Sequence, residues 1–241
     1  MNLRALAIAG IAVCLVSACA SEARSTTRAS SPALPDRPLR AGFLVVDGVY
    51  NTELTAPYDI FHHTPFHTEP GIEVFTVAPT RSPIRTFEGL VLQPEHDFDS
   101  APDIDILVVP SAEHSMDSDL ENAPLIDWVR DVGTRARFVI SLCDGAFVLA
   151  QAGLVKNRWS TTFPADQDRY AEMFPHLEIK RGVSFVHDGP LLTSAGGAQS
   201  FDVAMYLVAH LYGDEVARSV GRGLIIPWPQ PGVRSVVREL L

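Results

Sequence analysis

The fold of this chain is restricted most by an alternation of apolar runs with amphipathic segments. Four runs rich in β-branched residues have the length of a strand: 41–46, 72–78, 104–110 and 137–142. The last two are apolar at most positions, which is typical of strands buried on both faces. Between the runs, 52–62 and 120–133 carry apolar residues at helical spacing. The alternation predicts an α/β fold with a mostly parallel central sheet and helices on both faces.

The second half of the chain departs from this alternation. A short helix is expected over 145–152 and a longer one over 199–212. Between them, the runs 183–186 and 191–193 flank a turn and predict a short antiparallel hairpin. The segment 226–232 contains three prolines, so we expect it to be extended and free to pack on a partner subunit.

The N-terminus has the layout of a secretory signal peptide, predicted over residues 1–18. Its apolar run is shorter than the roughly 20 residues that a membrane-spanning helix needs. Val16-Ser17-Ala18-Cys19 resembles a bacterial lipobox, in which the cysteine is lipidated and becomes the new N-terminus. A signal peptide cut elsewhere, with Cys19 incidental, is the alternative.

Lipidation of Cys19 implies an exported protein anchored to a bacterial membrane surface, since several acyl chains hold a protein there stably. Alanine after Cys19 resembles the outer-membrane sorting signal, which places the domain in the periplasm. Residues 19–39 are rich in Ser, Thr, Ala, Pro and Arg, and we expect a flexible tether because they bury too little apolar surface to become ordered. The α/β domain is expected over 40–241.

Charge and cysteine content narrow the possible partners. The net charge of −10 argues against nucleic acid, whose phosphates attract basic surfaces. Two of the three cysteines, Cys14 and Cys19, fall in the signal region, so Cys143 has no partner for a disulfide within the domain. A lone thiol in an oxidising compartment is either buried and inert or used.

Cys143 stands between a predicted buried strand and a predicted helix. The small residues Ser141 and Gly145, two positions to either side, match a nucleophile elbow, where the chain reverses sharply. A helix N-terminus favours a thiolate, and the Asp144 amide is placed to face a developing oxyanion. A small buried cysteine without a chemical role is the alternative.

The residues around the elbow resemble the ThiJ/PfpI superfamily, and its isonitrile hydratase branch most. The resemblance covers residues 40–224 and rests on three segments: Ser-Leu-Cys-Asp-Gly-Ala-Phe-Val-Leu-Ala from residue 141, Ser160-Thr161-Thr162, and Gly196-Gly197 leading to 200–204. It implies a flavodoxin-like three-layer sandwich of the class I glutamine amidotransferase-like type and a homodimer. It also implies a small-molecule substrate.

The resemblance also implies a partner for the cysteine. In the family an acidic residue on the loop after the first strand hydrogen-bonds the cysteine, and Glu53 matches that position. A partly buried carboxyl beside a thiol has a raised pKa, so it can hold a proton at neutral pH and pass it on. Simple placement at a helix N-terminus, where acids are favoured, is the alternative for Glu53.

Three departures from the family pattern concern the chemistry. Asp144 follows the cysteine where proteases of the family have His, and an ionised carboxylate there would raise the thiol pKa above about 8.5. Otherwise Asp144 caps the helix or orients a water. Thr162 is followed by Phe163-Pro164 instead of His-Trp, which removes a polar group.

The third departure is the loop after 104–110, often Pro-Gly-Gly in the family, which reads Pro-Ser-Ala-Glu-His here. Because ligands bind beyond the carboxyl ends of such strands, the amide of Ser111 or Ala112 is expected to serve as the second oxyanion donor. His114 could supply the missing imidazole, although a solvated loop histidine is the alternative. Thr162 and Gly196 complete the predicted substrate-binding set.

No metal or cofactor is predicted. His62, His63 and His67 lie close in the sequence, but Pro65 interrupts the helix that would align two of them. We therefore predict a cysteine-dependent hydratase or hydrolase acting on a small electrophile, with Cys143, Glu53 and Asp144 as its catalytic residues. A non-enzymatic lipoprotein that binds a small molecule, senses redox state or acts as a chaperone is the alternative.

Overall fold

The computed structural model describes residues 34–238, so the predicted signal peptide, Cys19 and most of the tether lie outside the described residues. One sheet contains eight strands: β1 (Leu39–Leu44), β2 (Ile72–Ala78), β5 (His96–Asp97), β6 (Ile106–Val109), β7 (Phe138–Leu142), β10 (Phe185–Asp188), β11 (Leu191–Ser194) and β12 (Ser235–Arg238). Their order is β12-β10-β11-β7-β6-β1-β2-β5. Within this sheet β10 and β11 pair antiparallel and the other neighbours pair parallel. The predicted mostly parallel sheet and its hairpin are confirmed.

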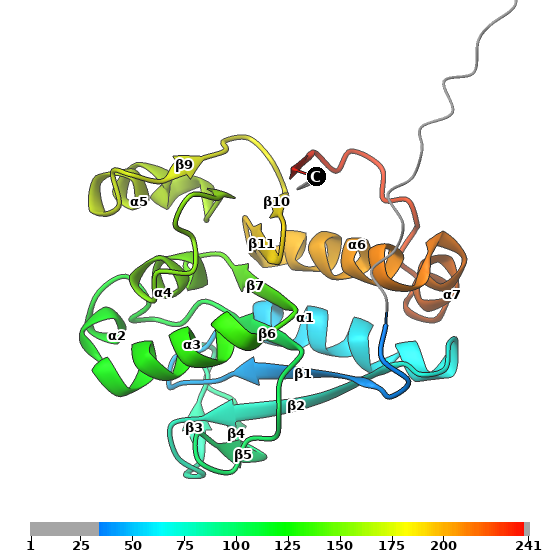
Figure 1. Cartoon of the computed structure of the whole chain (residues 1–241), viewed down its shortest axis with the longest axis horizontal. Helices are drawn as coiled ribbons and strands as arrows, with labels where there is room; N and C mark the ends of the chain where they lie inside the picture. Colours follow the sequence, from blue (N-terminus) through cyan, green and yellow to red (C-terminus); the bar gives the residue numbers. More distant parts are fainter. Residues whose placement is uncertain (1–33, 239–241) are drawn as a thin grey trace, which may run out of the picture. The chain divides into compact units, whose positions relative to one another are not determined.

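Seven α-helices are found in residues 34–238: α1 (Asn51–His62), α2 (Ser118–Glu121), α3 (Ala123–Arg135), α4 (Gly145–Gln151), α5 (Gln167–Met173), α6 (Ser200–Tyr212) and α7 (Asp214–Leu224). The helices α1, α6 and α7 contact one another, as do α2, α3 and α4 (Figure 1). Each group packs over its own cluster of buried apolar side chains, one on each face of the sheet. This is the predicted three-layer sandwich.

Short elements fill the connections between these strands and helices. Two small sheets pair β3 (Ile84–Arg85) with β4 (Val91–Leu92) and β8 (Trp159–Ser160) with β9 (Glu178–Ile179). Three 3-10 turns, η1 (Thr64–Phe66), η2 (Pro164–Asp166) and η3 (Gly197–Gln199), complete the described elements. No helix among the residues described is long and apolar enough to cross a membrane.

The helix expected over 120–133 is two helices. Asn122 separates α2 from α3, and its side-chain oxygen accepts a hydrogen bond from the amide of Leu125 (3.3 Å). Asparagine is a strong N-cap residue, and the proline that follows favours the first turn of a helix. The break therefore has a local cause that an apolar pattern does not show.

The C-terminal segment packs on its own chain. Ile226 and Trp228 lie against the core beside α6 and α7, and the Trp228 indole nitrogen donates to Asp214 (3.1 Å). Beyond it, β12 adds to the edge of the main sheet beside β10. The segment 226–232 contains bends and a turn and no helix or strand, and its apolar side chains cover the core of its own chain.

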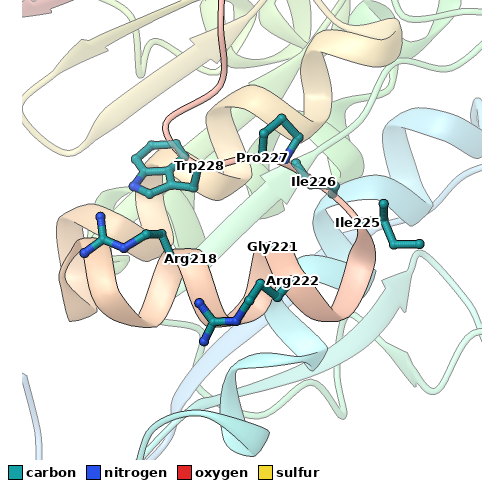
Figure 2. Close-up of a pocket in the computed structure, with 7 residues that line it drawn as sticks. All are labelled: Arg218, Gly221, Arg222, Ile225, Ile226, Pro227 and Trp228. Atoms are coloured by element: carbon teal, nitrogen blue, oxygen red, sulfur yellow. The ribbon is translucent and has the colours of Figure 1, made fainter.

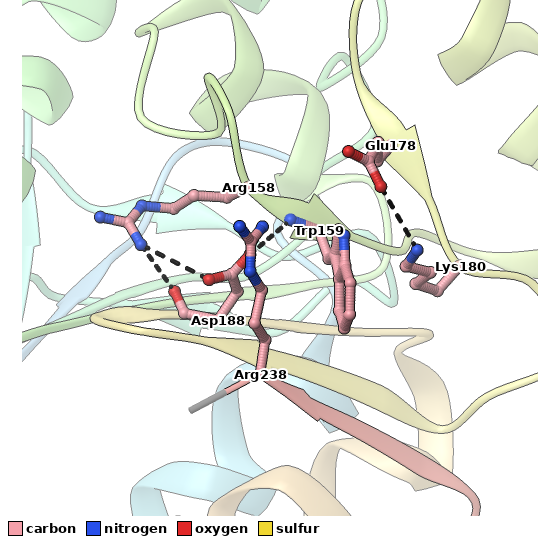
Figure 3. Close-up of polar contacts among 6 residues, drawn as sticks. All are labelled: Arg158, Trp159, Glu178, Lys180, Asp188 and Arg238. Atoms are coloured by element: carbon pink, nitrogen blue, oxygen red, sulfur yellow. Dashed lines mark hydrogen bonds and ion pairs between the residues drawn. The ribbon is translucent and has the colours of Figure 1, made fainter. Parts of the chain in front are cut away.

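A buried carboxylate fastens β12 to the rest of the domain. Asp188, whose side chain is 1% exposed, accepts hydrogen bonds from the Trp159 amide (2.8 Å) and from Arg238 (3.3 Å). The Trp159 ring lies between Lys180, 4.0 Å from its centroid, and Arg238 (Figure 3). Cations over an indole face stabilise such a stack. The last strand is therefore held by its charged side chains as well as by its backbone.

A buried histidine makes the stability of this domain depend on pH. The Nε2 atom of His187 donates to the Gly189 carbonyl (2.8 Å), so its Nδ1 accepts from the Tyr206 hydroxyl (2.8 Å). Burial, with a smaller effect of nearby His210, lowers the pKa of His187 to about 4. The neutral ring is thus the form that the folded state holds, while Asp188 weakly favours the charged form.

We expect the free energy of unfolding to fall as pH drops from about 6.5, the ordinary histidine pKa, to about 4, because only the unfolded state gains the proton. The contribution of this residue approaches about 1.4 kcal/mol per pH unit within that window. Urea unfolding of wild type and His187→Gln at pH 7, 5.5 and 4.5 checks it. Parallel pH curves for the two proteins would contradict the assignment.

Candidate functional site

The backbone at Cys143 makes the sharp turn that a nucleophile elbow requires. Its φ of 52° lies in the left-handed region, which costs energy for any residue other than glycine. The Cys143 amide donates to the Ser194 carbonyl at the end of β11 (3.0 Å). The neighbouring strand therefore holds the strained residue in place between β7 and α4. Such strain is typical of functional sites.

Two glycines make room for this turn. A side chain on Gly145 would overlap the backbone carbonyl oxygen of Val109 in β6. A side chain on Gly196, whose φ is +80°, would lie 2.8 Å from Cα of Cys143 and closer still to its Cβ. Both positions must lack a Cβ because backbone from two different loops meets the elbow there. The sequence motif selects Gly145, and the structure places Gly196 against the cysteine.

Glu53 lies beside the cysteine, near the beginning of α1, and is 5% exposed. Its Oε1 accepts from the Gly197 amide (3.1 Å) and its Oε2 from the Ser111 amide (3.0 Å). The Cys143 thiol also hydrogen-bonds this carboxyl. Burial raises the pKa of Glu53, and the two amides and the thiol offset that rise in part. The carboxyl is therefore anchored from two loops while facing the sulfur.

Asp144 is a second buried carboxyl at the sulfur. Its Oδ2 lies 3.6 Å from Sγ of Cys143, and its Oδ1 accepts from the Thr162 hydroxyl (2.9 Å). It makes no side-chain cap of α4, so the alternative of a helix-capping role is excluded. Burial is the main reason that the pKa of Asp144 rises to about 6, against the opposing hydrogen bond of Thr162. At pH 7 to 8 it is mostly ionised and able to accept a proton.

Thr162 is fully buried and connects Asp144 with the elbow. Its hydroxyl oxygen lies 2.9 Å from the Cys143 carbonyl oxygen and 2.9 Å from Asp144 Oδ1. A hydroxyl has one proton and can donate to only one of these acceptors at a time. An ionised Asp144 takes that hydrogen bond, whereas a protonated Asp144 donates to Thr162 and frees it for the carbonyl. The predicted substrate-binding Thr162 thus supports the carboxyl behind the sulfur.

The thiol between these carboxyls is neutral at physiological pH. Burial raises the pKa of Cys143 far above its ordinary value, and the charges of Glu53 and Asp144 raise it further. The amide of Asp144 stabilises the thiolate but does not outweigh these effects. The amide at the start of the helix therefore favours the thiolate, as expected, but burial and the adjacent carboxylates outweigh it. Deprotonation must accompany the reaction itself.

Two predicted oxyanion donors are already occupied. The Ser111 amide donates to Glu53, and the Ala112 amide donates to the Ser115 hydroxyl (2.9 Å). We therefore correct the assignment of Ser111 and Ala112: in this arrangement they hold Glu53 and the loop, and offer no free N–H to a substrate. The amide of Asp144, which contacts the sulfur, is the donor of the predicted set that faces the cysteine.

His114 is directed away from this chemistry. Its side chain is 53% exposed and lies 3.3 Å from Asp117, in a loop that hydrogen-bonds to itself through Ala112 and Ser115. The structure thus favours the alternative of a solvated loop histidine, and we withdraw His114 as a substitute imidazole. Residues 34–238 also contain no group of three or more His, Cys, Asp and Glu side chains able to hold a metal ion.

One site residue was missed in the sequence. Tyr50, just before α1, stacks on Phe87 with 4.4 Å between ring centroids. Its amide donates to the carbonyl of Ser111 (3.0 Å), whose own amide holds Glu53, so Tyr50 borders the same site. Phe87 is 52% exposed and lies between β3 and β4. The position of Tyr50 three residues before Glu53 is the sequence feature that could have indicated it as a site residue.

The sandwich and the elbow cysteine define the class of protein: a flavodoxin-like α/β protein with a nucleophile-elbow thiol. Residues 39–210 match the DJ-1/PfpI family, and the chain belongs to that family. The chain is 31% identical to the isonitrile hydratase of Pseudomonas putida over 185 residues, which cover 76% of each protein. It is also 31% identical to the HTH-type transcriptional regulator CdhR of Pseudomonas aeruginosa over 102 residues, 42% of this chain and 30% of that one.

Solved structures agree with the fold. A ThiJ/PfpI family protein from Pseudomonas syringae superposes with a TM-score of 0.71 at 23% identity, covering 88% of this chain and 85% of that one. DJ-1beta of Drosophila melanogaster superposes with a TM-score of 0.69 at 17% identity, covering 79% of this chain and all of that one. These similarities concern the fold. The family match over residues 39–210 and the similarity to isonitrile hydratase confirm the family resemblance that the elbow segment predicts.

Proposed function

We propose that this protein is a cysteine-dependent hydratase that adds water to a small electrophile of the isonitrile type. The observation that carries the proposal is the placement of one thiol between two buried carboxyls, Glu53 and Asp144. Burial raises the pKa of both carboxyls, and we assign Glu53 as the proton donor and Asp144 as the proton acceptor. The similarity to isonitrile hydratase supports the same reaction class.

The proposed reaction begins with the neutral thiol. As Cys143 Sγ bonds to the terminal carbon of R–N≡C, its proton passes to Asp144, and Glu53 donates a proton to the same carbon. The product is a thioimidate, R–N=CH–S–Cys. Water then adds to that carbon: its hydroxyl group bonds the carbon, its proton restores Glu53, and Asp144 gives the proton it holds to the nitrogen. Breaking the carbon–sulfur bond releases R–NH–CHO and returns a proton to the sulfur, so one water is consumed and nothing is oxidised.

The border of the site favours an apolar substituent on this substrate. Tyr50 and Phe87 form a stacked pair at the site, and Phe163, directly after Thr162, is 41% exposed. Aromatic faces of this kind bind hydrocarbon groups by burying apolar area. An uncharged R group also avoids the repulsion that the two carboxyls exert on anions.

Formamide production tests the proposal. We expect the full chain to convert alkyl and aryl isonitriles to the N-substituted formamides, followed by NMR, and Cys143→Ser to lose at least about 10³-fold of the rate, because the alcohol is a poor substitute for the thiol. His114→Gln is a matched control at an exposed position and should keep wild-type turnover. Equal rates for wild type and Cys143→Ser on each isonitrile tried would refute the proposal.

Location and assembly are further parts of the proposal. The lipobox-like segment before Cys19 supports an exported lipoprotein, held at the periplasmic face of the outer membrane, and family resemblance supports a homodimer. Metabolic labelling with radioactive palmitate in a Gram-negative host should mark wild type and leave Cys19→Ala unlabelled.

A non-enzymatic role is the second candidate, and one observation favours it. The thiol pKa is raised and the amides of Ser111 and Ala112 are occupied, which leaves few free donors to stabilise an oxyanion. In that case Cys143 would bind a small molecule or oxidise reversibly to a sulfenic acid beside Glu53. Mass spectrometry after graded peroxide treatment, together with absent turnover, would favour this role over catalysis.

A further inference from the structure

A pocket of about 630 Å³ lies at the end of α7, and none of its lining residues belongs to the Cys143 site. Its lining residues come from α7 and from the segment that follows: Arg218, Gly221, Arg222, Ile225, Ile226, Pro227 and Trp228. Pockets of this size suit small ligands.

The charge of the pocket comes from two arginines. Arg218 and Arg222 lie one turn apart on α7 and extend to the same side of the helix, with Trp228 across from Arg218 (Figure 2). Arg222 donates to the Ser219 hydroxyl (2.9 Å), and neither arginine forms an ion pair within residues 34–238. No carboxylate lines the pocket. In a chain of net charge −10, two unpaired guanidinium groups at one pocket favour an anion.

The apolar side of the pocket contains a strained residue. Ile225 ends α7 in the left-handed conformation, with φ 59° and ψ 35°, and its side chain is 93% exposed. Glycine or asparagine is usual at this position, because a β-branched residue is disfavoured there. The strain and the exposure of a large apolar group are both unfavourable in the free protein. A ligand that covers this side chain would recover part of that cost.

We propose that this pocket binds a small organic anion with an apolar body, such as a medium-chain carboxylate. The carboxylate lies between the guanidinium groups of Arg218 and Arg222. The hydrocarbon runs along Ile226 and Pro227, which also line the pocket, and covers Ile225. Asp214 holds the Trp228 indole as a fixed wall through its hydrogen bond of 3.1 Å. This inference is independent of the reaction proposed for Cys143.

Calorimetric titration of the full chain with octanoate tests the proposal. We expect saturable binding of octanoate to wild type and to Cys143→Ser alike, and affinities at least tenfold lower for acetate and for octanol, which each lack one half of the ligand. The double variant Arg218→Gln/Arg222→Gln should weaken octanoate binding at least tenfold. Arg135→Gln, which removes an exposed arginine paired with Asp131, should bind as wild type does.

Ile225→Gly should change protein stability and octanoate affinity in opposite directions. Glycine relieves the backbone strain, so the midpoint of urea unfolding should rise, while the loss of the side chain should weaken octanoate binding. Unchanged affinity in Ile225→Gly or in the arginine double variant would overturn the proposal. It would also be overturned if octanoate did not bind, if binding were seen only with anionic phospholipid vesicles, or if Ile225→Gly changed only the mass of the assembly in sedimentation.

Discussion

Asp144→Asn is expected to make the protein more stable and far less active. The pKa of Asp144 is raised to about 6 in the folded state, so the folded protein disfavours the ionised form. Removing that charge should raise the free energy of unfolding by up to about 3 kcal/mol at pH 8, since one pKa unit corresponds to about 1.4 kcal/mol. Turnover should fall about 10²- to 10³-fold, because the base that accepts the thiol proton is lost.

The pH dependence checks the cause of this effect. A raised carboxyl pKa contributes nothing at pH 3, where both states are protonated, and its cost grows as pH rises through about 4 to 6. The stabilities of wild type and Asp144→Asn should therefore converge in acid, separate between about pH 4 and 6, and differ by a constant amount above pH 6. Asp127→Asn, on the exposed face of α3, serves as the matched control. A variant that is stabilised and yet turns over at the wild-type rate would exclude Asp144 as the base.

Gly196→Ala should disable the site by displacing the nucleophile. Alanine at a φ of +80° is strained, and its Cβ would overlap Cys143. We expect a loss of about 2–4 kcal/mol in the free energy of unfolding, made up of the backbone conformation and a shift of the elbow. Movement of about 1 Å at a nucleophile can cost about 100-fold in rate. Thermal unfolding and turnover measured on the same preparation would show both losses.

Gly182→Ala separates the two contributions. Gly182 has a comparable φ of +68°, but a side chain there would meet no atom within 4 Å. It should lose only the backbone part of the stability, about 1–2 kcal/mol, and keep its turnover. If Gly196→Ala and Gly182→Ala gave the same unfolding temperature and the same turnover, the close approach of the Gly196 loop to Cys143 would not matter for activity.

The fold could be predicted largely from the sequence where burial is complete. All the residues of β6 and β7 are buried, and their apolar runs were sufficient to place them. β12 was missed because its four residues alternate between exposed and partly buried and follow a proline-rich segment. α7 was missed because it combines two glycines with charged residues, although one narrow apolar face packs on α6.

The site residues also divide into those that the sequence predicts and those that it does not. Cys143 follows from a local motif and Glu53 from the family resemblance, and the structure brings them together. The roles of Ser111 and Ala112 could not be foreseen, because the amide of Ser111 meets a carboxyl 58 positions away and that of Ala112 is taken by a turn. The direction of Asp144 depends on Thr162, which belongs to a different loop. Tertiary contacts decide which backbone N–H groups are free to donate, and a sequence motif does not show these contacts.

Cys143 is a neutral thiol held between two carboxyls, and we propose that Asp144 takes its proton during the reaction. Thiolate absorbance at 240 nm, followed from pH 5 to 10 in a Cys14→Ala/Cys19→Ala chain where Cys143 is the remaining thiol, measures this directly. We predict no thiolate below pH 9 in wild type and a lower titration midpoint in Asp144→Asn, because a neighbouring negative charge is removed. A wild-type midpoint below the ordinary thiol value of about 8.5 would contradict the account.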